Sequence, residues 1–227
     1  MTLYWRIIPC HHIAGLIWLV FSLAGCEQPN AGLWEQHAYF WFRSDTPKPV
    51  SVPSEINAVR VLVAQWSANG DAPWMLKSAM PETVPMPGST IVVVRLDGVA
   101  ITVPAADVAQ SLKQGLSGRL AGGTPQAIEI DHDSATARLG DYARWLGEFR
   151  EAWGTQSPIW ITALPDWRRS ASLSELLDAV DTYTLQIHAL DANSDELIEQ
   201  ERALAWIAQF EARSATPYFV ALPTYAL

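Results

Sequence analysis

One stretch of the chain decides its fold class: Ala127-Ile128-Glu129-Ile130-Asp131-His132-Asp133. Successive side chains of a strand point to opposite faces, so the two isoleucines and His132 lie on one face. The three carboxylates, Glu129, Asp131 and Asp133, lie on the other. An apolar face packs against helices, whereas buried carboxylates need partners or water. We therefore expect a strand of an α/β domain that points its acids into a polar site.

Six further apolar runs have the composition of strands, being rich in Val, Ile, Tyr or Trp. They cover residues 38–42, 59–66, 90–96, 158–164, 183–188 and 217–222. Apolar residues recur at helical spacing between several of them, at residues 105–116, 139–149, 173–180 and 197–208. Alternating strands and helices predict parallel strands joined by crossovers, and seven strands favour a (β/α) TIM-type barrel over an open sheet.

Two features depart from a complete barrel of eight units. Residues 67–89 carry Gly, Pro and polar residues in place of a clear helix. The chain also reaches Leu227 just after the seventh run. We expect an α/β barrel of about seven strands over residues 37–227, either incomplete or truncated at its C-terminus.

The first 25 residues have the pattern of a signal peptide. A basic Arg6 precedes an apolar run at residues 13–24, which is too short for a typical spanning helix. Leu23-Ala24-Gly25-Cys26 then resembles the bacterial lipobox, whose cysteine thiol is acylated. The pattern predicts a signal peptide at 1–25, a lipidated Cys26 with a tether at 26–36, and an exported lipoprotein facing the periplasm or cell surface. The alternatives are an uncleaved anchor, or an ordinary signal with an incidental cysteine.

The composition indicates which classes of partner the protein can bind. Hydrophobic residues make up 49% of the chain, which indicates a folded domain. The formal net charge is −9, and so acidic a chain repels phosphate backbones. We therefore expect no nucleic-acid partner, and attachment to the membrane through the lipid on Cys26.

Polar and aromatic side chains gather at the carboxyl ends of the predicted strands, where barrel enzymes place their chemistry. Carboxylates and amides beside aromatic rings suit sugars, which stack on rings and hydrogen-bond through hydroxyls. The predicted ligand-binding residues are Trp41, Arg95, Asp97, Trp167, Gln186, His188 and Tyr225. His37 has no partner pattern and is predicted to lie on the surface.

Asp131 and Asp133 are the predicted catalytic pair. Two residues apart on a strand, they are about 6.6 Å apart at Cα, so their carboxylates could approach the separations of roughly 5–9 Å that glycosidases use. Most glycosidase pairs come from different strands, and Asp97 and Asp166 are the alternative acids for such a pair. Two alternatives to catalysis also stay open. The site could bind a sugar without catalysis, or a buried network of hydrogen bonds could fix the barrel interior. That network would comprise Glu129, Asp131, Arg95, Gln186 and His188.

A metal site is not predicted, because strand alternation sends His132 away from the two neighbouring aspartates. No phosphate loop, nucleophile elbow or nucleotide-binding fingerprint is present, and we expect no cofactor.

Residues 128–133, followed by Leu139, Tyr142 and Arg144-Trp145-Leu146, resemble the central motif of the bacterial family DUF3142. Residues 38–41, 161–167, 185–188 and 221–225 match in the same order. The resemblance implies a glycoside-hydrolase-type TIM barrel, often on lipoproteins, with no known reaction.

Two departures from the family pattern bear on activity. Ser134-Ala135 stands where members often have Cys-Pro, and the chain ends soon after the tyrosine motif. We expect a lipoprotein that binds, and could hydrolyse, an envelope glycan. A non-catalytic carbohydrate-binding or structural lipoprotein is the alternative.

Overall fold

A computed structural model describes most of the chain. The described residues are 5–10, 35–40, 54–69, 72–78, 90–98, 100–116, 125–155, 157–187 and 198–223. Of the predicted site residues, Cys26, Trp41, His188 and Tyr225 lie outside them.

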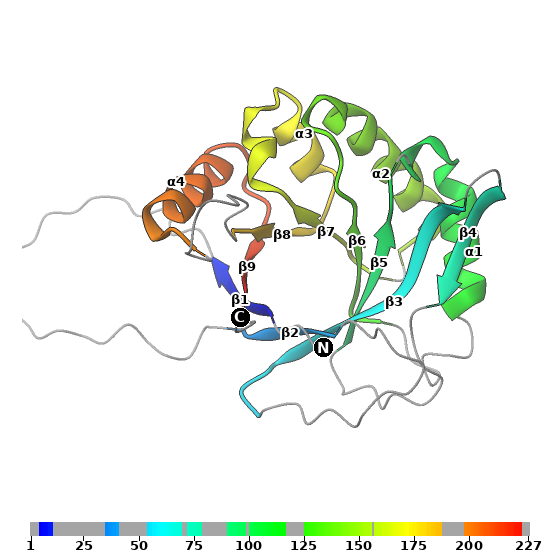
Figure 1. The fold of residues 1–227 in the computed structure, drawn as a ribbon, viewed down its shortest axis with the longest axis horizontal. Helices are drawn as coiled ribbons and strands as arrows, with labels where there is room; N and C mark the ends of the chain where they lie inside the picture. Colours follow the sequence, from blue (N-terminus) through cyan, green and yellow to red (C-terminus); the bar gives the residue numbers. More distant parts are fainter. Residues whose placement is uncertain are drawn as a thin grey trace, which may run out of the picture.

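Seven parallel strands form the body of the sheet, in the order β2-β3-β5-β6-β7-β8-β9. They are β2 (His37–Phe40), β3 (Ala58–Asn69), β5 (Thr90–Leu96), β6 (Ala127–Asp131), β7 (Ile159–Ala163), β8 (Thr182–Gln186) and β9 (Tyr218–Pro223). The sheet curls into a ring of strands (Figure 1). The prediction of an incomplete (β/α) TIM-type barrel with about seven strands is thereby confirmed.

Two antiparallel strands complete the sheet of the described residues. β4 (Ala72–Ser78) forms a hairpin with β3, in the segment where the sequence shows no clear helix. β1 (Trp5–Cys10) pairs with β9 and also contacts β2. β1 therefore lies between the first and last parallel strands, although its residues belong to the predicted signal peptide.

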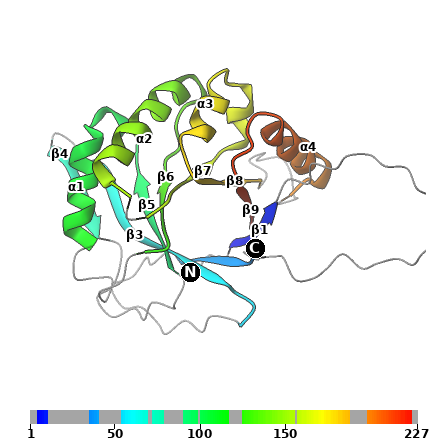
Figure 2. The ribbon, with the colours of Figure 1, turned by 180° about the vertical axis from the view of Figure 1, so that it is seen from behind.

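The helices pack against the outer face of the ring (Figures 1 and 2). They are α1 (Ala105–Leu116), α2 (Leu139–Trp153), α3 (Leu173–Asp178) and α4 (Gln200–Glu211), with short 3-10 turns η1 (Ala100–Thr102), η2 (Thr136–Arg138) and η3 (Pro165–Arg169). Within the described residues, none of the helices is both long enough and apolar enough to span a membrane.

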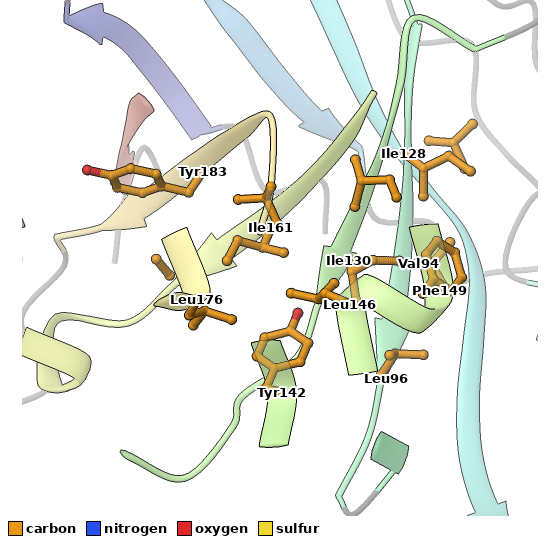
Figure 3. Packing of buried hydrophobic residues seen from close by; sticks show 14 of the residues in the cluster. Val94, Leu96, Ile128, Ile130, Tyr142, Leu146, Phe149, Ile161, Leu176 and Tyr183 are labelled. Atoms are coloured by element: carbon orange, nitrogen blue, oxygen red, sulfur yellow. The ribbon is translucent and has the colours of Figure 1, made fainter. Parts of the chain in front are cut away.

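The apolar layer between sheet and helices explains why β6 and α2 form. Ile128 and Ile130 on the outer face of β6 are fully buried with Leu146 and Phe149 of α2 (Figure 3). Burying each such side chain contributes about 1.5–3 kcal/mol. The helix ends at Gly154, whose φ of 81° favours glycine.

The inner face of the sheet carries a separate set of buried residues. Its apolar members are Tyr39, Ala58, Leu62, Ile91, Val93, Ala127, Trp160 and Phe219. Side chains of β6 alternate strictly between this inner set and the outer layer, as the period-2 pattern predicts. The charged side chains of β3, β5 and β6 therefore project into the barrel.

Candidate functional site

Two layers of polar side chains lie inside the ring, and β6 contributes an acid to each. We call the first the inner layer, made of His37, Tyr39, Arg60, Glu129 and Thr184. We call the second the rim layer, made of Gln65, Arg95, Asp97, Asp131, Asp133 and Thr162. Because the strands are parallel, the rim layer lies toward their carboxyl ends, where barrel enzymes hold their active sites.

An ion pair between Arg60 and Glu129 is the centre of the inner layer, and both side chains have zero exposure. Arg60 Nη1 donates to Glu129 Oε2, and also to Thr184 Oγ1 at 2.8 Å. The Tyr39 hydroxyl donates to the other carboxylate oxygen, Oε1. Burial raises the pKa of Glu129, while Arg60 and Tyr39 oppose that rise. The layer is sealed, so its charges are satisfied by protein groups alone.

Aromatic rings enclose the Arg60 guanidinium. Its Cζ lies 4.9 Å from the ring centroid of Trp160 and 4.8 Å from that of Phe219. A cation over the face of a ring is attracted by the quadrupole of the ring, most strongly where water is excluded. Trp160 thus packs against a protein cation within the barrel.

His37 is buried, so the prediction that it lies on the surface was wrong. Its Nδ1 lies 3.2 Å from both Nε and Nη2 of Arg60. Because a guanidinium only donates, Nδ1 must accept, and the ring is neutral. Burial and then the Arg60 charge lower the pKa of His37 to about 3. β2 begins at His37, one residue before the predicted run at 38–42, so strand alternation places His37 on the same inward face as Tyr39.

Arg95 organises the rim layer by binding three carboxylates. Nη1 donates to Asp131 Oδ2 at 2.8 Å, Nη2 donates to Asp133 Oδ2, and Nε donates to Asp97 Oδ1 at 3.2 Å. Burial alone would lower the pKa of Arg95, but Asp131 and Asp133 outweigh burial and raise it. The guanidinium is therefore permanently charged and held on three sides.

Asp131 is the buried member of the rim layer, with 2% of its side chain exposed. Oδ1 accepts from Thr162 Oγ1 at 2.7 Å, while Oδ2 accepts from Arg95. Burial raises the pKa of Asp131, and its two donors oppose the rise. Since each carboxylate oxygen already has a protein donor, Asp131 acts here to position Arg95.

Asp133 and Asp97 are the accessible members of the rim layer. Their side chains are 48% and 35% exposed. Asp97 Oδ2 accepts from the Gln65 amide, and its Oδ1 from Arg95. For Asp133, only Oδ2 has a hydrogen bond to another described residue. Carboxylate acceptors are thus available to a ligand at this end of the barrel.

The structure brings Arg95, Asp97, Asp131 and Asp133 together as the sequence predicts. Gln186 is half-buried at the end of β8, on the same face of its strand as Thr184. Among the described residues, no hydrogen bond joins the Gln186 side chain to the rim layer. Its predicted part in ligand binding stays a prediction.

Trp167 does not fit its predicted stacking role. Its side chain is 1% exposed, and the indole N–H donates to the Ser134 carbonyl at 2.9 Å. Its ring meets that of Tyr142 edge to face, at 6.2 Å between centroids. The turn η3 packs Trp167 into the helix layer, so no ring face is open to a sugar.

His132 points away from the two aspartates, as strand alternation predicts. Its Nδ1 lies 2.9 Å from the Leu96 carbonyl, and its ring meets Tyr142 edge to face. Burial lowers the pKa of His132. Among the described residues, no group of three His, Cys, Asp or Glu side chains is arranged to hold a metal ion.

Sequence reasoning recognised that the first strand offers Tyr39 to the site, but it missed Arg60. An arginine within the apolar run Val59-Arg60-Val61-Leu62 was the available signal, because a charge in a buried strand needs a partner. Glu129 was recognised as facing inward, but its predicted network contained Arg95, Gln186 and His188, and its ion-pair partner is Arg60.

The DUF3142 family, described as a domain of unknown function, matches residues 86–227. The chain belongs to this family. No curated protein matches the sequence significantly.

Two solved structures share the fold of this DUF3142 protein. The chitinase domain of the spore coat protein CotE from Clostridium difficile has a TM-score of 0.56 at 13% identity, over 84% of this chain and 64% of that domain. The spore cortex-lytic enzyme SleL from Bacillus cereus has a TM-score of 0.51 at 10% identity, over 70% of this chain and 41% of that one. The chain thus spans less than two thirds of either. At such identities the likeness shows a glycoside-hydrolase-type barrel fold alone.

Proposed function

We propose that this DUF3142 protein binds a saccharide of the cell envelope at the rim layer. One observation carries the proposal: Arg95 is fixed by the buried Asp131, while Asp133 and Asp97 remain half-exposed beside it. The rigid part of the site and the accessible part are therefore distinct. Such preorganisation lowers the entropy lost when a ligand binds.

The chemistry of these groups suits sugar hydroxyls. A hydroxyl donates to a carboxylate through a charge-assisted hydrogen bond, which is stronger than a bond between neutral groups. The fold supports the proposal, since a chitinase domain and a cortex-lytic enzyme share it. The place of the rim layer at the carboxyl ends of the strands supports it as well.

Hydrolysis is the second candidate function. It is favoured by the raised pKa of Asp131, a property that a general acid requires, and by the neighbouring Asp133. The burial of Asp131 and its two protein donors weigh against it, because an acid must reach the glycosidic oxygen. Binding without cleavage is therefore the better-supported function.

A glycan array with product analysis tests both functions on the full chain in detergent. Binding that Asp133→Asn removes, without released product, supports binding alone. Product that both Asp131→Asn and Asp133→Asn abolish supports hydrolysis. Asp141→Asn is the matched control, because Asp141 is an exposed aspartate of α2 that pairs with Arg138. Absence of binding to every glycan would refute the proposal.

We also propose that the protein is exported and lipidated at Cys26. The lipobox-like sequence at residues 23–26 supports this. Cleavage before Cys26 would separate β1 from β9, since β1 is formed by residues 5–10. Mass spectrometry of the membrane-bound protein should find acyl chains on Cys26 and none in Cys26→Ser. An intact N-terminus in the mature protein would refute the proposal.

A further inference from the structure

The rim layer has an unequal balance of charge. Three carboxylates, Asp97, Asp131 and Asp133, pair with a single guanidinium, that of Arg95. Among the described residues, no second lysine or arginine forms an ion pair with any of them. Within the described part of the rim layer, the most exposed charged side chains are therefore the carboxylates of Asp97 and Asp133.

The charge of the guanidinium is already outnumbered by its partners. Its Nε, Nη1 and Nη2 each donate to a different aspartate, which uses three of its five N–H donors. An acidic sugar that approached the remaining N–H donors would lie beside the three carboxylates. Like charges placed together cost energy, so this arrangement disfavours uronic acids and phosphorylated glycans.

The exposed atoms instead offer hydrogen-bond acceptors. Oδ1 of Asp133 has no hydrogen-bond donor among the described residues, and the side chain is 48% exposed. Asp97, 35% exposed, lies on the other side of Arg95. A ligand that brings donors and positive charge would satisfy these oxygens, whereas a ligand that brings acceptors would not.

We infer that the site prefers saccharides with free amino groups, such as de-N-acetylated hexosamines, over N-acetylated or acidic ones. This inference rests on the proposed saccharide binding and names its ligand class. An ammonium has three donors and a full charge, so it binds a carboxylate through a charge-assisted bond. An acetamide has instead one neutral N–H donor and a carbonyl acceptor.

The test uses three probes of equal length: oligomers of β-1,4-glucosamine, the same oligomers fully N-acetylated, and oligogalacturonate. Calorimetry with the full chain in detergent should show the free-amine oligomer binding about fivefold more tightly than the acetylated one, as expected for one half-exposed ion pair. The preference should shrink at high salt, because salt screens exposed charges.

Variants test whether the preference for the free-amine oligomer arises at the rim layer. Asp133→Asn should remove most of the preference for the amine, and Asp97→Asn is a second variant should Asp133→Asn lose its fold. Asp141→Asn is the control and should keep the preference, since Asp141 lies on α2, which packs on the outer face of the ring.

The outcomes separate the two proposals. Equal or tighter binding of the acetylated or acidic oligomer would overturn the inference and leave saccharide binding standing. A preference for the amine that survives both rim variants would also overturn it, because another surface would then be responsible. Failure of all three oligomers to bind would count against the inference, and failure of a wider glycan array would also refute the proposed function.

Discussion

The inner and rim layers each contain an ion pair between an arginine and an acid of β6, at two depths of one barrel. Arg60 reaches Glu129 from β3, and Arg95 reaches Asp131 from the adjacent strand β5. The two acids are two residues apart on one face of β6. The layers differ in access. Arg60 and Glu129 are fully buried. In the rim layer 26% of the Arg95 side chain is exposed, and its partner Asp133 is half-exposed. The comparison separates a charge network that holds the fold from one that can meet a ligand.

Removing one partner of the inner pair should have the largest effect. In Arg60→Met the Glu129 carboxylate would stay buried without its cation, which costs about 3–5 kcal/mol of unfolding free energy. Urea denaturation measures this loss. The control is Arg138→Met, which breaks an exposed pair with Asp141 and should cost less than about 1 kcal/mol.

A double variant sharpens this prediction. Replacing both partners, as in Arg60→Met with Glu129→Met, leaves no uncompensated charge and should recover most of the lost stability. A double variant as unstable as Arg60→Met alone would show that the ion pair is not the cause. The contacts of Arg60 with Trp160 and Phe219 would then be the more important ones.

The next largest effect should be on the pH dependence of stability, to which His37 of the inner layer contributes. The pKa of His37 is about 3 in the folded protein against 6.5 ordinarily, so between these values the unfolded chain binds a proton that the folded chain does not. Stability therefore falls as the pH drops from 6.5 toward 3. His37→Gln can still accept from Arg60 but does not titrate, so its urea midpoint should fall less over this window.

The buried acids act in the opposite direction. The pKa values of Glu129 and Asp131 are raised in the folded protein, so their protonation favours the folded state as the pH falls. The difference between wild type and His37→Gln isolates the histidine, because both proteins keep these acids. Parallel pH curves for the two proteins would contradict a neutral, buried His37.

Asp131→Asn should have a smaller effect, because the rim layer keeps two other acids around Arg95. The asparagine oxygen can still accept from Thr162, but its NH₂ group would face the Arg95 donors. We expect a loss of about 1–3 kcal/mol, measured by urea denaturation. A loss equal to that of Arg60→Met would mean that the rim layer is as structural as the inner layer.

The strands could be predicted from the sequence because each has a strong local signal. The run at 127–131 coincides with β6, and the inward direction of Asp131 follows from alternation around two isoleucines. β4 was missed for a different reason. Its hairpin with β3 is local, since only residues 70 and 71 separate the two strands, and Asn69-Gly70 is a hairpin signal. The Gly, Pro and polar residues of 67–89 were interpreted only as the absence of a helix.

The site could be predicted only in part. Arg95 near the end of β5 and Asp97 just after it face the same rim as Asp131, so topology alone brings them together. The pairing of Arg60 with Glu129 joins residues 69 positions apart and depends on the registers of β3, β5 and β6. Trp167 was misplaced because a strand-end position does not reveal that the following turn folds back over the helices.

Asp133→Asn should change stability least and binding most. Asp133 is half-exposed, and its loss leaves Asp131 and Asp97 to hold Arg95, so the free energy of unfolding should stay within about 0.5 kcal/mol of wild type. Saccharide affinity should nevertheless fall about tenfold, as expected when one charge-assisted hydrogen bond is lost. Paired denaturation and calorimetry measure both. A variant that is strongly destabilised but keeps full affinity would contradict the assignment of the rim layer to binding. A rim acid would then hold the fold without contacting the ligand.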